Sequence, residues 1–255
     1  MPSSLTIIIP VLNEEAEVAR ILTGARALLE ARLGEWEIIV VDNASTDRTC
    51  ELAAPFVDGK QVRLLRNEVN RGKGYSIRRG MLEATGDLRL MCDADCVDSL
   101  SSVPRMERAA EEVDVVIGSR LRAGASVTRH QPIRRRIVGA GFIALSRVVM
   151  GRLPRDVYCG FKLWRAEAAS EVFANVTVDG WAFDAEALAL VRQLGYTSRE
   201  VGIEWSNRPD SRLSIGSVLV PVTAELLKAR RNLHRVAATP RPKSESDLVS
   251  RVETA

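Results

Sequence analysis

The sequence predicts an α/β fold, with a mostly parallel sheet covered by helices on both faces. Two observations predict it. Short, near-continuous apolar runs alternate with stretches of helical periodicity, and polar residues directly follow several of these runs. The 255 residues are 46% hydrophobic and 27% charged, which is ordinary for a globular protein. This composition excludes disorder, collagen and coiled coil as the main architecture.

Five apolar runs are predicted to be strands. The first is expected to end at Pro10, because proline cannot donate a hydrogen bond within a sheet. In chain order the runs are Leu5–Ile9, Trp36–Val41, Val62–Leu65, Leu88–Cys92 and Val113–Ile117.

Three helices are predicted between these strands. The first spans Glu14–Ala31 and carries apolar residues at helical spacing. The second spans 47–57, with Ser45 or Thr46 as its cap. The third spans Gly74–Thr85 and is expected to end at Gly86. This order is typical of a sheet whose ligands bind beyond the carboxyl ends of its strands.

Polar clusters stand at those carboxyl ends. Asn13-Glu14 follows the first strand, Asp42-Asn43 the second, and Asp93-Ala94-Asp95 the fourth. Two carboxylates one residue apart can share a hard cation and leave room for phosphate oxygens. The alternative is a turn in which the aspartates cap backbone N–H groups. The position after a buried strand favours metal binding.

Residues 70–74, Asn-Arg-Gly-Lys-Gly, precede the third helix. Lys73 and the helix N-terminus favour an anion, although such a run is often an ordinary loop. The sequence has no P-loop motif, and no Gly-rich dinucleotide motif follows the first strand.

The middle of the chain is strongly basic. Between Arg120 and Arg165 there are eleven Lys and Arg residues and one acidic residue, Asp156. This polarity predicts an anionic partner for the segment, and the alternative is a solvated basic face.

Two segments have amphipathic helical patterns. Ile137–Leu153 combines apolar residues with Arg147 and Arg152, and Ile215–Val236 is apolar early and basic late. Either segment could lie at a lipid headgroup region or pack as a surface helix. No apolar run reaches the roughly 18 residues of a membrane span.

Several motifs together resemble family 2 GT-A glycosyltransferases. They are residues 7–14, 40–47 and 70–81, and Asp93-Ala94-Asp95. Further motifs at 118–120, 156–162, 181–186, 204–205 and 211–212 are similar to the dolichyl-phosphate glucosyl- and mannosyltransferases, the glucosyl branch above all. The resemblance implies a GT-A (Rossmann-like) fold, followed by C-terminal amphipathic helices.

The resemblance also implies a donor site. Pro10, Val11 and Glu14 would hold the nucleotide base and ribose, and Asp42 would accept from the base ring N–H. Further nucleotide-sugar contacts would come from Lys73, Asp93, Ala94 and Arg212. Asp95, with Asp93, would ligate Mg²⁺ or Mn²⁺. Val97 stands where some relatives have another polar ligand.

The acceptor half follows from the same resemblance. Arg120 would bind an acceptor phosphate, assisted by Arg134 and Lys162. Asp184 and Glu186 would orient the sugar or acceptor, or act as the base if the acceptor is a hydroxyl. The alternative for these two acids is a favourable place at a helix N-terminus.

The predicted activity is therefore inverting transfer of a hexose, UDP-glucose being the favoured donor, to a polyprenyl or dolichyl phosphate. The alternative is a soluble glycosyltransferase that acts on a small hydroxyl compound. A non-catalytic nucleotide-sugar-binding protein would have less need of Asp93 and Asp95. We expect no nucleic-acid partner.

The predicted organisation has three parts. A catalytic domain at 1–213 comprises a nucleotide-sugar-binding part at 1–117 and an acceptor-binding part at 118–213. An amphipathic helical segment at 214–238 and a disordered tail at 239–255 follow. Four cysteines in a chain of this length do not make a disulfide scaffold. We expect a cytoplasmic protein with peripheral contact to the inner face of the membrane.

Overall fold

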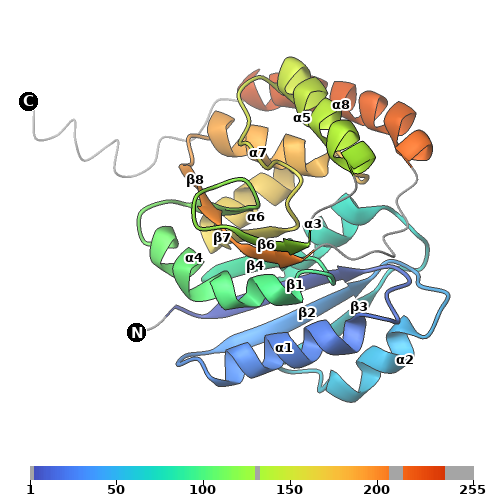
Figure 1. The fold of residues 1–255 in the computed structure, drawn as a ribbon, viewed down its shortest axis with the longest axis vertical. Helices are drawn as coiled ribbons and strands as arrows, with labels where there is room; N and C mark the ends of the chain where they lie inside the picture. Colours follow the sequence, from blue (N-terminus) through green and yellow to red (C-terminus); the bar gives the residue numbers. More distant parts are fainter. Residues whose placement is uncertain (1–2, 130–132, 207–214, 239–255) are drawn as a thin grey trace, which may run out of the picture.

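The computed structural model describes the chain except residues 1–2, 130–132, 207–214 and 239–255. Its centre is a seven-stranded sheet of order β3-β2-β1-β4-β7-β5-β8 (Figure 1). The strands are β1 Leu5–Val11, β2 Trp36–Asp42, β3 Val62–Arg66, β4 Leu88–Cys92, β5 Val115–Ser119, β7 Phe161–Arg165 and β8 Ser198–Gly202. The predicted mostly parallel α/β fold is confirmed.

One strand runs against the others. β7 pairs antiparallel with both β4 and β5, whereas β1–β2, β2–β3, β1–β4 and β5–β8 are parallel. β5 contains both residue 117 and residue 118, so the predicted boundary within the catalytic domain falls inside a strand. A small second sheet pairs β6 Ser126–Arg129 with β9 Glu204–Ser206.

Helices cover both faces of the large sheet. One face carries α1 Val18–Glu30, α2 Thr49–Ala53 and α4 Val103–Ala110, and the other carries α3 Lys73–Glu83, α6 Ala166–Asn175 and α7 Phe183–Gln193. α5 Ile133–Met150 and α8 Ile215–Ala238 pack against each other and against α7 (Figure 1). Two short 3₁₀ helices, η1 Ala54–Phe56 and η2 Val97–Ser102, complete the fold.

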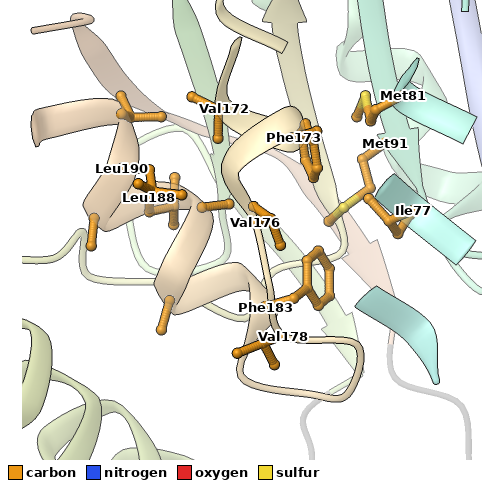
Figure 2. Packing of buried hydrophobic residues seen from close by; sticks show 14 of the residues in the cluster. Ile77, Met81, Met91, Val172, Phe173, Val176, Val178, Phe183, Leu188 and Leu190 are labelled. Carbon is orange, nitrogen blue, oxygen red and sulfur yellow. The ribbon is translucent and has the colours of Figure 1, made fainter. Parts of the chain in front are cut away.

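The core has one hydrophobic layer on each side of the sheet. Figure 2 shows part of the layer beneath α3, α6 and α7, where Phe183 faces Ile77 and Phe173 lies close to Met91. The buried side chains of Val176 and Val178 also enter this layer, from the loop between α6 and α7. That loop is therefore anchored in the core directly before α7 begins.

Some predicted boundaries were wrong. β1 continues through Pro10 to Val11, because β1 pairs with β4 only as far as Ile8 and Pro10 needs no hydrogen bond on that side. The predicted 47–57 helix is divided into α2 and η1, since Pro55 lacks the N–H that would continue α2.

The predicted caps and ends of the helices also differ from those observed. The hydroxyl of Ser45 accepts from the Asn13 N–H instead of capping α2. α1 begins at Val18 instead of Glu14. α3 ends at Glu83, and Gly86 instead allows close packing, because a Cβ there would lie 2.7 Å from Thr6 Oγ1. Within the described residues, no helix is both long and apolar enough to cross a bilayer.

Candidate active site

The polar clusters predicted from the sequence meet at one edge of the sheet. β1, β2 and β4 are parallel, so their carboxyl ends lie on the same side. Asn13 and Asp93 lie in the loops that follow β1 and β4, and Asp42 is the last residue of β2. This edge is where open α/β sheets bind ligands.

The loops after β1 and β2 hold each other in place. Asn13 adopts a positive φ of 55°, and its Oδ1 accepts from the Thr46 N–H at 2.8 Å. The N–H of Glu14 donates to Thr49 Oγ1 at 2.8 Å. These contacts fix the backbone that follows Pro10 and Val11, where the nucleotide base is predicted to lie.

Asp42 is fully buried at the end of β2. Its Oδ1 accepts from the Ser45 N–H at 3.1 Å, and its Oδ2 lies 3.4 Å from Arg66 Nε. The predicted base-binding carboxylate is therefore held rigidly by its own loop and by an exposed arginine.

An asparagine network positions the segment before α3. Asn43 Nδ2 donates to Asn70 Oδ1 at 2.8 Å, and Asn43 Oδ1 accepts from the Arg71 N–H at 3.0 Å. Gly72 has a φ of 97° and lies against Asp179 O, where a Cβ would approach to 2.3 Å. Lys73 then begins α3 and points toward β4.

The aspartate pair follows β4. Asp93 Oδ2 accepts from Lys73 Nζ at 2.6 Å, whereas its Oδ1 is buried and has no hydrogen-bond partner. Asp95 lies two residues further on, with Cys96 Sγ 3.6 Å from its Oδ1. The buried Ala94 separates them. A buried, unpartnered carboxylate oxygen is costly, and a bound cation would remove that cost.

The charges at this edge influence one another. Burial raises the pKa of Asp95 and the charge of Asp93 adds to the effect, while Lys73 opposes it. Burial lowers the pKa of Lys73, but Asp93, Asp184 and Asp95 outweigh it and hold that pKa above its usual range. Lys73 is therefore cationic at neutral pH, and the aspartates gain from a further positive charge.

A second ion pair lies deeper. Lys162 Nζ is 2.6 Å from Asp184 Oδ1 and donates to Cys159 O at 2.5 Å, and both side chains are buried. Burial raises the pKa of Asp184, although Lys162 and Lys73 partly offset it. Asp184 also lies in the first turn of α7, as the alternative interpretation predicted.

Arg120 forms a bidentate ion pair with Asp156. Its Nε lies 2.9 Å from Oδ2 and its Nη2 lies 2.6 Å from Oδ1. Burial raises the pKa of Asp156, but hydrogen bonds and charge from Arg120 outweigh it and hold that pKa below its usual range. The Arg120 guanidinium also lies 5.1 Å from the ring centre of Trp205. Asp156, the single acid of the basic segment, thus orients Arg120.

The other predicted acceptor residues are placed differently. Glu186 is fully buried and accepts from the N–H groups of Thr177 and Val178, at 2.9 and 2.8 Å, and from Asn232 Nδ2 at 2.8 Å. This geometry gives Glu186 a role within the fold, and its predicted acceptor contact stays a prediction. Arg134 belongs to α5, whose first turn has no described side chains. Arg212, which is predicted to contact the nucleotide-sugar, lies outside the described residues.

Gly160 has a role at the site that was not predicted from the sequence. The Asp93 N–H donates to Gly160 O at 2.9 Å, and a Cβ at Gly160 would lie 1.8 Å from Asp93 Oδ2. A side chain at this position would displace the carboxylate. The sequence signal was the glycine of the 156–162 motif. Its role became clear only from the pairing of β7 with β4, which places Gly160 beside Asp93.

A model described as glycosyl transferase family 2 matches residues 6–173. The chain belongs to this family. The matched residues include the loops after β1, β2 and β4, as well as Arg120 and Lys162. Most residues of the candidate site therefore lie within the part of this glycosyltransferase that matches the family. The predicted enzyme class and GT-A fold are confirmed.

Curated relatives cover nearly the whole chain. A dolichyl-phosphate beta-glucosyltransferase of Trichomonas vaginalis is 33% identical over 227 residues, which are 84% of this chain and 67% of the relative. The human dolichyl-phosphate beta-glucosyltransferase is 30% identical over 224 residues, covering 82% and 69% respectively. The predicted family resemblance is confirmed.

Solved structures share the fold. Glucosyl-3-phosphoglycerate synthase of Mycobacterium tuberculosis superposes with a TM-score of 0.66 at 20% identity, over 90% of this chain and 81% of that chain. The same synthase has been crystallised with Mn²⁺, UDP and glucosyl-3-phosphoglycerate, with a TM-score of 0.65. That GT-A neighbour therefore binds UDP together with a divalent metal.

Proposed function

We propose that this glycosyltransferase moves glucose from UDP-glucose to a polyprenyl phosphate, with inversion at the anomeric carbon. The observation that carries the proposal is the arrangement of Lys73 beside Asp93. A cation and a half-buried carboxylate with one unpartnered oxygen suit a metal-bound diphosphate. The names of the relatives supply the donor sugar and the lipid class.

The donor half acts by binding and orientation. The loops after β1 and β2 would hold the base and ribose, with Asp42 facing the base. Asp93 and Asp95 would hold Mg²⁺ or Mn²⁺, which when bound supplies Lewis-acid neutralisation of the leaving diphosphate. In the part of the chain that the structure describes, no group of three or more His, Cys, Asp or Glu side chains could hold a metal ion. Two carboxylates suffice in this proposal, because Mg²⁺ commonly keeps several waters and takes substrate phosphates as ligands.

Lys73 adds a fixed positive charge beside the leaving group. As the bond between the anomeric carbon and the diphosphate breaks, its electron pair passes to the diphosphate oxygen. A preorganised ammonium stabilises that developing charge without rearrangement. Proton transfer to the leaving group is not needed, because a nucleoside diphosphate is a stable anion.

The acceptor half has a different task. A lipid phosphate oxygen is already ionised at neutral pH, so it can attack the anomeric carbon without a strong base. The sugar would pass through an oxocarbenium-like state, as in glycoside hydrolysis. Arg120, oriented by Asp156, would hold the incoming anion beside the leaving one.

The buried Lys162–Asp184 pair would support both halves. Asp184 influences the pKa of Lys73, whereas Lys162 lies on β7, the strand that follows the Asp156–Gly160 segment. On this proposal the pair affects catalysis without contacting the acceptor. Its proposed contribution is to fix the relative positions of the charged side chains in the donor and acceptor halves.

We also propose peripheral membrane contact through α5 and α8. These helices pack together and leave Val148 and Leu227 exposed, at 82% and 50%. Exposed basic residues accompany them, namely Arg147, Lys228, Arg230 and Arg231. Apolar side chains beside basic ones suit the headgroup region of an anionic leaflet. On this proposal, residues 1–117 serve the donor and 118–213 serve the acceptor. α5, within the second part, and the segment 214–238 also contact the membrane.

A donor screen tests the proposed function. UDP- and GDP-sugars are each incubated with Mn²⁺ or Mg²⁺, and nucleoside diphosphate release is followed with and without a short polyprenyl phosphate. We expect release from UDP-glucose only when the lipid phosphate is present. Release from UDP-glucose at the same rate without the lipid phosphate would contradict the lipid acceptor and favour the alternative, a small hydroxyl acceptor.

A further inference from the structure

The loop between α6 and α7, residues 176–182, connects α8 to the donor site. On one side it contacts α8: the Ala182 N–H donates to Glu225 Oε2 at 2.9 Å, and Lys228 Nζ donates to Thr177 O at 2.6 Å. α8 is far from the donor residues in sequence. The contacts between α8 and this loop link α8 to the donor residues.

On the other side, the same loop packs against the start of α3. The Tyr75 N–H donates to Asp179 O at 3.1 Å, and Arg78 lies 2.7 Å from Asp179 Oδ1. A Cβ on Gly74 would lie 2.6 Å from Val178 O. The backbones of the loop and of α3 are therefore in direct contact, with no room for a side chain at position 74.

Trp181 extends this contact to the charge beside Asp93. The Lys73 ammonium lies 5.5 Å from the centre of the Trp181 ring and 2.6 Å from Asp93 Oδ2. An aromatic face at this distance attracts a cation. The loop thus forms one wall of the position that Lys73 occupies, and Asp93 forms the other.

Two different anchors hold the two ends of the loop. Val176 and Val178 are buried in the core, and Glu186 accepts from the N–H groups of Thr177 and Val178 (Figure 2). Trp181 is 41% exposed. Next to it, Glu225 Oε2 binds the Ala182 N–H, and a Cβ on Gly180 would lie 1.8 Å from Glu225 Oε1. Glu225 therefore fixes the end of the loop that carries Trp181.

We infer that Glu225 is a positioning residue for donor binding. It holds residues 180–182 so that Trp181 and Asp179 keep Lys73 where the donor diphosphate binds. This inference rests on the proposed function, because it takes Lys73 to face a diphosphate. Glu225 itself touches neither substrate, and it acts through the loop.

Two single variants perturb the same contact from opposite sides. Glu225→Ala removes the acceptor of the Ala182 N–H. Gly180→Ala adds a methyl group that displaces the flexible Glu225 carboxylate. Because both break one contact, the double variant is expected to be no worse than either single variant. Glu111→Ala, an exposed glutamate at the end of α4, is the matched control.

The measurement is the Kd of UDP in the presence of Mn²⁺, by calorimetry on the full chain, with donor and acceptor KM as second readouts. Each single variant is expected to raise the UDP Kd and the donor KM about fivefold, the size of one exposed cation–π contact that no longer orients Lys73. The acceptor KM and the Glu111→Ala values stay unchanged. An unchanged UDP Kd, with loss confined to kcat or to the melting temperature, would assign Glu225 a merely structural role and overturn the inference.

The outcomes separate this inference from the proposed function. UDP binding needs no acceptor, so a failure of lipid-dependent transfer leaves the Glu225 test intact. If the native chain binds UDP and both variants bind it equally well, the inference alone is wrong. If the native chain binds no UDP with Mn²⁺, the donor assignment is wrong, and the inference falls with it.

Discussion

The ammonium nitrogen of Lys73 lies 2.6 Å from Oδ2 of Asp93, joining the first residue of α3 to the first residue after β4. The remaining oxygen of Asp93 is buried without a partner. A carboxylate neutralised on one side and free on the other is suited to a ligand that brings its own cation. This relationship gives the site its proposed chemistry.

Asp95→Asn is expected to abolish most transfer. An amide is a much weaker ligand for Mg²⁺ or Mn²⁺ than a carboxylate, and loss of the metal's charge stabilisation should lower kcat by about 10²–10³-fold. Steady-state kinetics and Mn²⁺ titration measure the effect. Asp98→Asn is the control, since Asp98 lies nearby in η2 and pairs with Arg20 at the surface. Equal turnover in the two variants would refute the metal assignment.

Lys162→Met is expected to lower the free energy of unfolding by about 3–5 kcal/mol, because it leaves the buried Asp184 carboxylate without its partner. The double variant Lys162→Met, Asp184→Leu should regain much of that loss, since no unpaired charge remains in the core. Urea unfolding measures both. A double variant no more stable than Lys162→Met would contradict the expectation that the unpaired Asp184 charge causes the loss.

Asp156→Asn is expected to remove a pH-dependent part of the stability. Arg120 holds the pKa of Asp156 below its usual range, so the contribution is complete above the unfolded value of about 3.9 and is lost as the pH falls through the lower folded value. The variant should therefore be less stable at pH 7, by about 3 kcal/mol. Unfolding from pH 7 to pH 2 should show the two proteins converging at the acid end. A constant difference would contradict this.

Val148→Asp is expected to weaken association with vesicles that contain anionic lipid, because it places a charge on the exposed face of α5. Leu33→Asp is a matched control, since Leu33 is also 82% exposed but follows α1, on the opposite side of the sheet. Co-sedimentation measures the bound fraction. Equal binding by the two variants would place the membrane contact elsewhere.

Much of the donor side could be predicted from the sequence, because it depends on local order. Buried strands end in polar residues, and parallel pairing brings Asp42 and Asp93 to one edge. Even the boundaries of β4 were predicted correctly. The errors at Pro10 and Ser45 arose where a neighbouring strand or loop decides what a residue does.

The acceptor side was harder to predict, because its contacts join residues distant in sequence. β7 enters the sheet between β4 and β5, against the parallel direction, and so brings Gly160 and Lys162 beside the aspartates. The pairing of Arg120 with Asp156 spans 36 residues. The internal role of Glu186 depends on Asn232 of α8, which no local pattern could supply.

The most direct test of the proposed function is UDP release from UDP-glucose with Mn²⁺, in the presence and absence of a short polyprenyl phosphate, with the lipid product identified by mass. The proposed function predicts UDP release that depends on the lipid phosphate and is matched mole for mole by a glucosylated lipid phosphate. The release should be about 10²–10³-fold slower in Asp95→Asn. UDP release at the same rate without the lipid, and with no lipid product, would contradict it.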